Sequence, residues 1–334
     1  MSPRVTREDV ARVAGTSTAV VSYVINNGPR PVADATRRRV LAAIDAVGYE
    51  PDTIARALAS GTTGSYGLIV PDISNPFFAG LAHELQLATA AAGRVVILAD
   101  AAEDKQRETE LLRSFAARRI DGLLFVGVDD DPDLTPILAA SIPTVSLDRT
   151  PDSHPLSSVA IDNVAAARDV TAHLIAHGYT HIGIVGGPPE LLLARERSDG
   201  WRQALADAGI PVDRRWAAHA PFTNKGGFDA AMAMLTAPDR PRAIFAASEQ
   251  QAVGLLSAAS DLGLRVPDDL AVISFDGTDA SEYTVPRLSG AVQPLGEIAQ
   301  AAVSLLDSAR AQPPAHVVIP HRLRLRPSCG DHSQ

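Results

Sequence analysis

Seven short apolar runs, most of them separated by segments with helical patterning, constrain the fold of this chain more than any other feature. The runs occupy residues 67–70, 95–98, 122–126, 142–147, 182–185, 243–246 and 270–275. Continuous apolar runs of this length are typical of parallel strands that are buried on both faces. The chain from residue 66 onward is therefore predicted to be a doubly wound α/β structure, with enough strands for two sheets.

Residues that follow the apolar runs are candidate ligand contacts, because open parallel sheets bind ligands beyond the carboxyl ends of their strands. The candidates are polar or aromatic: Asp72, Asn75, Phe77, Phe78, Asp148, Arg149, Ser248, Glu249 and Asp276, with Arg197 and Trp201 after another strand and Phe222 in an irregular segment. Carboxylates and an arginine can hydrogen-bond hydroxyl groups, and aromatic faces can stack on a ring, which suits a sugar or a nucleoside. Taken singly, such an Asp is more often a helix cap and such a Phe more often part of a core.

The first sixty residues show a different pattern, that of short helices. Thr6 and Asp9 have the spacing of a capping box, and Gly15 can adopt the left-handed conformation that ends a helix. Ser17 is a good N-cap for a second helix, and a third helix is predicted over residues 34–47. This order of elements predicts a helix-turn-helix unit.

The second of these helices has two distinct faces. Its apolar face, which would pack on the first helix, consists of Val21, Val24 and Ile25. Its opposite face is short and polar and consists of Thr18, Ala19, Ser22, Tyr23 and Asn26. Such a face suits the reading of base edges in a DNA major groove. The alternative from the pattern alone is a small helical domain with an ordinary polar surface.

Charge is distributed unevenly along the chain. The formal net charge is −9, yet residues 1–62 hold eight arginines against six acidic residues, so this part is positive and the remainder is strongly negative. The excess is modest, and it permits contact with phosphates without proving it. The single cysteine, Cys329, and the lack of an apolar leader or of a membrane-spanning run predict a cytoplasmic protein without a membrane partner.

Several motifs resemble one known family along nearly the whole chain. They are residues 5–17, 20–26, 36–52, 70–78, 159–163, 197–200, 266–270 and 275–277. These motifs resemble the lactose/galactose-repressor (LacI/GalR) family, whose effector domain is itself similar to periplasmic sugar-binding proteins. The resemblance implies an N-terminal all-α helix-turn-helix with a hinge helix, followed by a bilobal, periplasmic-binding-protein-like domain of two doubly wound parallel sheets.

The resemblance also implies which residues contact DNA. Base readout falls on Thr18, Ala19 and Tyr23, and phosphate contacts fall on Thr6, Ser17, Ser22, Asn26 and Thr36. In a hinge helix over residues 51–60, too short to persist alone, Ala55, Arg56 and Leu58 would meet the minor groove, with Leu58 wedged between bases. Many members have arginine where this chain has Tyr23, so the operator cannot be copied from relatives.

Positions that commonly touch the effector in this family are also present. They are Phe77, Phe78, Asp148, Arg197, Phe222, Ser248, Asp276 and Gln293. The pair Ser248 and Glu249 departs from the usual Asn-Asp, and residues 288–290 depart from Leu-Thr-Thr. The expected ligand is a sugar or a nucleoside-like molecule.

The resulting domain division has three parts. Residues 1–49 would bind DNA, residues 50–63 would form the hinge helix and linker, and residues 64–334 would bind the effector and dimerise. The first lobe would comprise residues 64–160 and 293–320, and the second lobe residues 161–292 and 321–334. The chain is expected to act at the nucleoid as a repressor, a homodimer or tetramer on near-palindromic double-stranded DNA.

Other functional classes lack sequence support. His173, His177 and His181 are spaced by four residues, but Gly178 would separate the third, so no metal site is expected. Residues 129–131 are three aspartates without the rest of a calcium loop and are interpreted as a solvated turn. Without a phosphate loop or catalytic set, neither an enzyme nor a cofactor is expected. The alternative is a solute-binding receptor of a transport system, which would need a signal peptide and no helix-turn-helix.

Overall fold

The computed structural model describes residues 5–25, 30–50, 61–147 and 156–332. The chain divides into two compact units, Met1–Thr63 and Gly64–Gln334. Asn26, Ala55, Arg56, Leu58 and Asp148, all predicted to be functional, lie outside the described residues. Among the described helices, none is both long enough and apolar enough to cross a membrane.

The described part of the first unit is a bundle of three helices, α1 (Arg7–Ala14), α2 (Thr18–Ile25) and α3 (Asp34–Val47). Their common core consists of Val10, Ala11, Ala14, Val21, Val24, Val40, Ala43 and Tyr49. Because the signals that begin and end these helices are local, the predicted third helix has the observed bounds.

Two sheets with flanking helices form the second unit. The first sheet contains β1 (Ser65–Val70), β2 (Val95–Asp100), β3 (Gly122–Phe125), β4 (Thr144–Ser146), β5 (Ser157–Ala160) and β11 (His316–Val318), in the order β11-β5-β4-β3-β1-β2, with every neighbouring pair parallel. Its helices are α5 (Pro76–Ala90), α6 (Lys105–Arg118), α7 (Thr135–Ala139) and α12 (Leu295–Ser308). Since side chains alternate along β1, Leu68 packs towards α5 and α12 while Ile69 packs towards α6 and α7.

The second sheet has the same design. It contains β6 (Ile182–Gly186), β7 (Ala217–His219), β8 (Ala243–Ala246), β9 (Ala271–Ser274), β10 (Ser289–Val292) and β12 (Arg322–Arg324), in the order β12-β10-β9-β8-β6-β7. The helices α8 (Asn163–Ala176) and α9 (Leu192–Asp207) form one layer, and α10 (Asn224–Leu235) and α11 (Glu249–Asp261) form another. Three short 3-10 turns, η1 (Arg214–Trp216), η2 (Asp279–Glu282) and η3 (Pro327–Cys329), complete this lobe.

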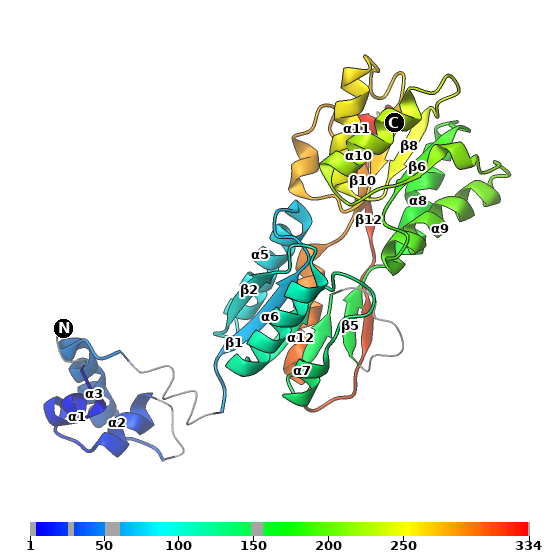
Figure 1. Cartoon of the computed structure of the whole chain (residues 1–334). Coiled ribbons are helices and arrows are strands. Elements are labelled where there is room, and N and C mark those ends of the chain that lie inside the picture. The colour runs from blue at the N-terminus through cyan, green and yellow to red at the C-terminus, as the bar shows by residue number, and fades with distance from the viewer. Residues whose placement is uncertain (1–4, 26–29, 51–60, 148–155, 333–334) are drawn as a thin grey trace. The chain divides into compact units, whose positions relative to one another are not determined.

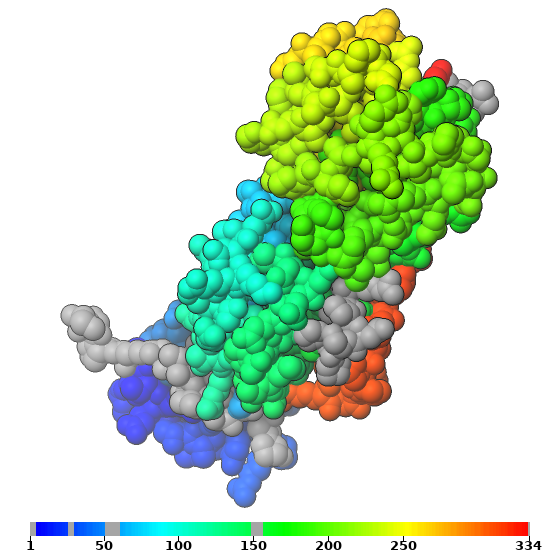
Figure 2. All heavy atoms as spheres, turned by 45° about the vertical axis from the view of Figure 1, so that its right-hand side comes forward, coloured from blue at the N-terminus to red at the C-terminus, as the bar shows by residue number. Residues whose placement is uncertain are grey.

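The chain passes between the two lobes three times. It leaves the first sheet after β5, returns after β10 to form α12 and β11, and leaves again to form β12 (Figure 1). Figure 2 shows the two lobes of the second unit, one coloured cyan to green with an orange segment and the other green to yellow. The prediction of a helical N-terminal part followed by two parallel-dominated α/β sheets is confirmed.

Two details of the sheets differ from the prediction. The β12 strand runs antiparallel to β10, so the second sheet is mixed. The run at residues 95–98 was expected to be buried on both faces, but β2 lies at the edge of its sheet, where Val95, Ile97 and Leu98 are 60%, 38% and 37% exposed. An apolar sequence pattern does not show whether a strand is covered by helices of its own chain or by the surface of another molecule.

Candidate functional site

The helix face that the sequence predicts to contact base edges belongs to α2. Thr18 and Ala19 are exposed and Ser22 and Tyr23 are half-buried, while Val21 and Val24 on the opposite face are buried in the core of the bundle. The two faces of this helix therefore lie as the sequence predicted, and the polar one is available to a groove of DNA.

Hydroxyl groups predicted to contact phosphates also cap the helices. Both donors of Thr6, its backbone N–H and its Oγ1 hydroxyl, point at the Asp9 carboxylate at 3.0 and 2.8 Å, in a complete capping box. Arg12 and these two Thr6 donors lower the pKa of Asp9 to about 2, so the carboxylate is ionised. A phosphate contact from Thr6 would therefore have to displace a charged acceptor.

Ser17 and Thr36 are placed differently from Thr6. The Ser17 hydroxyl accepts the backbone N–H of Val20 at 3.3 Å and so caps α2. A hydroxyl that accepts one hydrogen bond can still donate its own hydrogen to a phosphate. Thr36 lies half-buried in the first turn of α3, which begins after Ala33 without a side-chain cap.

A cavity of about 430 Å³ in the second unit brings together residues from distant parts of the sequence. Its lining includes seven of the eight predicted effector contacts: Phe77, Phe78, Arg197, Phe222, Ser248, Asp276 and Gln293. The two phenylalanines belong to α5 of the first lobe, whereas Arg197, Phe222, Ser248 and Asp276 belong to the second. The volume falls within the range of small-molecule sites.

A buried charge pair forms the polar side of this cavity. Arg197 and Asp276 are 6% and 7% exposed, and Arg197 Nη1 lies 3.7 Å from Asp276 Oδ1. Arg197 also donates to the carbonyl oxygen of Ala247 at 2.6 Å and to Asn163 Oδ1 at 3.0 Å. Asp276 accepts hydrogen bonds from Gln293 Nε2 at 2.9 Å and from the backbone N–H of Glu249 at 3.1 Å. Both charged groups are thus held in fixed orientations before any ligand arrives.

The backbone at Asp276 is also unusual. Its φ is +80°, a conformation that L side chains other than Asn and Asp seldom adopt. Strained backbone of this kind persists where surrounding contacts hold it, and such residues cluster at ligand sites. Here the contacts with Gln293 and Glu249 hold the carboxylate at the cavity wall.

Aromatic rings form the apolar side of the cavity. Phe77 and Phe78 lie edge to face with ring centroids 5.3 Å apart, and the Arg197 guanidinium lies 5.7 Å from the ring centroid of Phe222. Gly187 makes room for Phe222, because a Cβ atom there would lie 2.1 Å from the Cζ atom of that ring. The site can therefore stack against a ring while it hydrogen-bonds to polar groups on the rim of that ring.

The structure explains the roles of Ser248 and Glu249, which stand where the family usually has an Asn-Asp pair. Ser248 Oγ accepts the backbone N–H of Gln251 at 3.2 Å and caps α11. Glu249 turns to Thr278, whose backbone N–H donates to its carboxylate at 2.7 Å. Burial raises the pKa of Glu249, and the neighbouring Asp276 adds to the shift. Glu249 thus shapes the wall from behind rather than lining the cavity.

Three interpretations from the sequence need correction. Trp201 is 1% exposed and belongs to the core. Asp72 accepts hydrogen bonds from the backbone and hydroxyl of Ser74 in a local turn. Asp130, assigned to a solvated turn, lines the cavity and accepts hydrogen bonds from the Leu192 backbone N–H at 2.8 Å and from Arg195 Nη2 at 3.0 Å. Asp130 therefore joins the first lobe to α9 of the second.

Asn163 was missed as a site residue although it lies in a quoted family motif. It lines the cavity and supports Arg197, and its Nδ2 donates to Glu196 at 3.1 Å. Its position in the quoted motif, directly after Asp162, which caps α8 in the structure, was the available signal.

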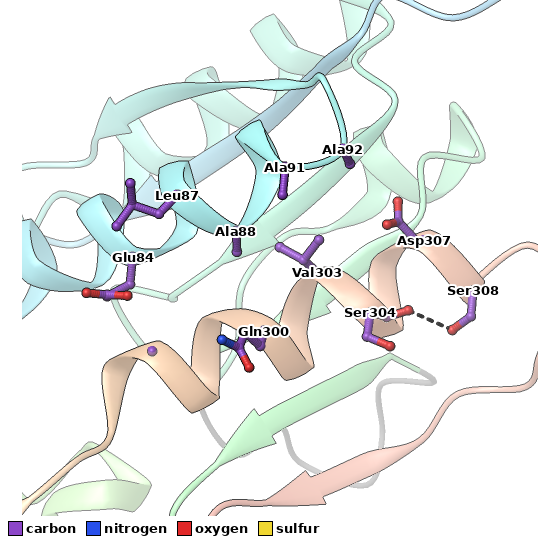
Figure 3. Close-up of a pocket in the computed structure, with 11 residues that line it drawn as sticks. Glu84, Leu87, Ala88, Ala91, Ala92, Gln300, Val303, Ser304, Asp307 and Ser308 are labelled. Carbon is purple, nitrogen blue, oxygen red and sulfur yellow. Dashed lines mark hydrogen bonds between the residues drawn. The ribbon is translucent and has the colours of Figure 1, made fainter.

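A larger hollow of about 900 Å³ lies between α5 and α12 (Figure 3). Its lining is mostly small or aliphatic, including Leu87, Ala88, Ala91 and Val303, with Glu84 and Asp307 at its margins. It is an open groove on a helical surface, so the smaller, more enclosed cavity with its buried charge pair, Arg197 and Asp276, is the better candidate for a ligand site.

Comparison with known proteins agrees with both parts of the chain. Residues 6–52 match the family model described as bacterial regulatory proteins, lacI family, and residues 171–329 match the periplasmic binding protein-like domain. The transcriptional repressor PurR of Photobacterium profundum is 38% identical over 303 residues, which cover 90% of each chain.

Two solved structures are similar over nearly the full length. The lac repressor dimer bound to operator and the anti-inducer ONPF has a TM-score of 0.86 and 25% identity, over 98% of this chain and 100% of that one. The complex of the transcriptional regulator CelR with cellobiose has a TM-score of 0.74 and 30% identity, over 97% of this chain and 100% of that one. These similarities favour a regulator over the alternatives of a transport receptor or an enzyme. The chain belongs to the LacI family of bacterial regulatory proteins and is a DNA-binding transcriptional regulator.

Proposed function

We propose that this chain is a homodimeric repressor whose affinity for a near-palindromic operator is controlled by a sugar or a nucleoside-like effector. The observation that carries the proposal is the convergence of seven predicted contacts on one enclosed cavity of the second unit. Residues 1–49 would bind DNA, residues 50–63 would connect, and residues 64–334 would bind the effector. A regulator of chromosomal DNA acts in the cytoplasm at the nucleoid.

The chemistry of the cavity supports this class of effector. The buried carboxylate of Asp276 can accept hydrogen bonds from hydroxyl groups, and the Arg197 guanidinium can donate them. The rings of Phe77 and Phe222 offer flat apolar surfaces. A polyhydroxylated ring satisfies both kinds of surface, and an apolar molecule would leave the charge pair without new partners.

Control of DNA binding would follow from the placement of the cavity. Asp130 of the first lobe already contacts α9 of the second, so an effector bound nearby would favour one lobe arrangement over others. A ligand shifts such an equilibrium only by the difference between its affinities for the two states.

Homodimerisation is supported by the exposed apolar surface of the first lobe. Val95, Ile97 and Leu98 on β2 are exposed, and Leu87 on the neighbouring helix α5 is 56% exposed and lines the groove in Figure 3. Apolar surface of this extent marks contact with another protein surface. The similar lac repressor structure is a dimer on its operator. A second copy of this chain would bury the exposed apolar side chains of β2 and α5 in the same way.

The dimer surface can be tested with a matched pair of charge substitutions. Leu87→Asp should shift the chain from dimer to monomer in sedimentation experiments and lower its operator affinity. The control is Leu138→Asp on α7, at the opposite face of the first sheet, where the wild-type leucine is 47% exposed. A dimer that survives Leu87→Asp would contradict the assigned surface.

The DNA-binding proposal is tested by operator selection followed by variants at Tyr23. Tyr23→Ala should weaken binding to the selected site by roughly 10-fold or more and leave binding to random DNA nearly unchanged, because base contacts specify and phosphate contacts do not. Tyr283→Ala, at a tyrosine that is 83% exposed in the second unit, is the control. Equal affinity of the wild-type chain for selected and random DNA would contradict the proposal.

The effector proposal is tested by a thermal-shift screen with sugars, nucleosides and their phosphates. A ligand of the folded state raises the midpoint of unfolding in proportion to the logarithm of its concentration above Kd. A genuine effector should also change operator affinity. A ligand that stabilises the chain without altering operator affinity would argue against control through this cavity.

A further inference from the structure

Three histidines meet at the C-terminal end of α8. His173 lies in the last turn of α8, His177 follows it, and His332 lies just after η3. The ring centroids of His173 and His177 are 4.6 Å apart. The ring centroid of His332 lies 5.2 Å from that of His173 and 5.1 Å from that of His177. One nitrogen of each ring lies within 4.8 Å of the others. Three imidazoles from two separate segments therefore point at one small volume.

The third histidine of this group is His332, whereas the spacing in the sequence had drawn attention to His181. Gly178, with a φ of +87°, turns the chain after α8, and His181 packs against Trp216 with ring centroids 5.0 Å apart. The separation of His181 was thus predicted, but the arrival of His332 was not, because 155 residues separate it from His177.

A fourth potential ligand lies beside the histidines. Cys329 is fully buried, and its Sγ lies 3.3 Å from His332 Nε2 and 3.5 Å from His173 Nε2. In a tetrahedral zinc site, with Zn–N of about 2.0–2.1 Å and Zn–S of about 2.3 Å, the nitrogen and sulfur ligands lie about 3.5 Å from each other. These two sulfur–nitrogen separations match that geometry, whereas the three histidine nitrogens lie within 4.8 Å of one another and would have to close to about 3.3 Å around the ion.

The path of the backbone makes this approach possible. Gly330 has a φ of +140°, and a Cβ atom there would lie 2.8 Å from His177 Nδ1. The absence of a side chain lets the segment pass close to the His177 ring and return His332 to the group. His332 Nε2 also lies 3.1 Å from the carbonyl oxygen of Arg326, a contact that a metal ion would replace.

Binding of a divalent ion to Cys329 Sγ would release the thiol proton to solvent, because the thiolate is the form of cysteine that binds metal ions.

We propose that His173, His177, His332 and the Cys329 thiolate bind one divalent transition-metal ion of the zinc class. Three nitrogen ligands and one sulfur ligand suit zinc, and hard ions such as Mg²⁺ and Ca²⁺ prefer oxygen. Because α8 supplies two ligands and residues 329–332 supply the other two, the ion would fasten the segment after β12 to the second lobe. The site is separate from the residues that line the effector cavity.

The test uses the full chain, stripped of metal with a chelator and then titrated. Calorimetry with Zn²⁺ should give one ion per chain, and Co²⁺ should give the absorption of tetrahedral cobalt with a thiolate-to-metal charge-transfer band. His177→Ala, at an exposed position, should lower Zn²⁺ affinity by at least about 10-fold. His181→Ala, at another exposed histidine, is the matched control and should bind as wild type.

Cys329→Ser separates the role of the sulfur from the role of the histidines. This variant should lose the charge-transfer band and bind Zn²⁺ more weakly, while circular dichroism of the metal-stripped chain confirms that it is folded. The proposal is overturned if the wild type binds no stoichiometric Zn²⁺, if His177→Ala binds as tightly as His181→Ala, or if cobalt bound to the wild type lacks the thiolate band.

Discussion

Asp276→Asn removes the negative charge from the buried pair at the proposed effector cavity. Asparagine tolerates the φ of +80° at this position as aspartate does, so the backbone can stay in place. The remaining side-chain oxygen can still accept the backbone N–H of Glu249. What is lost is the negative charge 3.7 Å from Arg197 Nη1, together with the Oδ1 acceptor of Gln293 Nε2, because an amide has only one oxygen.

The magnitude follows from what remains around Arg197. Removal of one partner from a buried ion pair costs about 3–5 kcal/mol when the other charge is left uncompensated. Arg197 keeps its hydrogen bonds to Ala247 and Asn163, so we expect a smaller loss of about 2–3 kcal/mol in the free energy of unfolding. For a unit of the size of residues 64–334, the midpoint should fall by about 4–5 °C.

Tryptophan fluorescence is a suitable assay because both tryptophans, Trp201 and Trp216, belong to the lobe that holds Asp276. Asp199→Asn is the matched control, because it removes the charge of an Asp–Arg pair whose side chains are about half exposed, and it should change stability by less than about 0.5 kcal/mol. If Asp276→Asn unfolds at the wild-type midpoint and binds effector with wild-type affinity, the pair has neither of the roles assigned to it.

Three further predictions follow from single contacts. Gly187→Ala should displace the Phe222 ring, which a new Cβ atom would approach to 2.1 Å, and lower effector affinity by roughly 10-fold in calorimetry. Asp130→Asn should loosen the contact between the lobes, because it removes the ion pair with Arg195, and speed effector dissociation in stopped-flow experiments. Glu108→Gln should flatten the pH dependence of stability. Burial raises the pKa of this carboxyl from its ordinary 4.5, so its stabilising contribution is complete below that value and is lost as the pH rises through the folded-state pKa. The variant should therefore be more stable than wild type at pH 7, with the two curves converging near pH 4.

Exposed neighbours provide the controls for two of these variants. Asp131→Asn and Glu110→Gln change the same chemical groups at exposed positions and should behave as wild type. An effector dissociation rate unaltered by Asp130→Asn, or a pH profile unaltered by Glu108→Gln, would contradict the assigned contact. For Gly187→Ala, unchanged effector affinity would mean that the Phe222 ring is not part of the binding surface.

Local signals made much of the fold predictable. The capping box at Thr6 and Asp9 and the left-handed glycine Gly15 act within four residues, so the sequence alone locates the first helix. The long apolar runs predicted most central strands for the same reason. Strands such as β7 and β11 have three residues each, too few for any periodic pattern, and they were not predicted.

The sites depend on contacts that no local pattern contains. Asp130 meets Arg195 across 65 residues, and His332 meets His177 across 155. The proposed effector contacts were predicted through resemblance, because each residue alone had an ordinary structural explanation. The cavity unites residues that the chain brings together only when both lobes are complete.

The three passages between the lobes have a consequence for how this protein can be cut. Neither lobe is a continuous stretch of chain, since α12 and β11 complete the first sheet after the second lobe has been built, and β12 then pairs with β10. A stop codon near residue 293 would remove an edge strand from both sheets at once. Isolated lobes would therefore have to be obtained by joining segments with new linkers, and a premature termination late in the gene should inactivate the whole molecule rather than half of it.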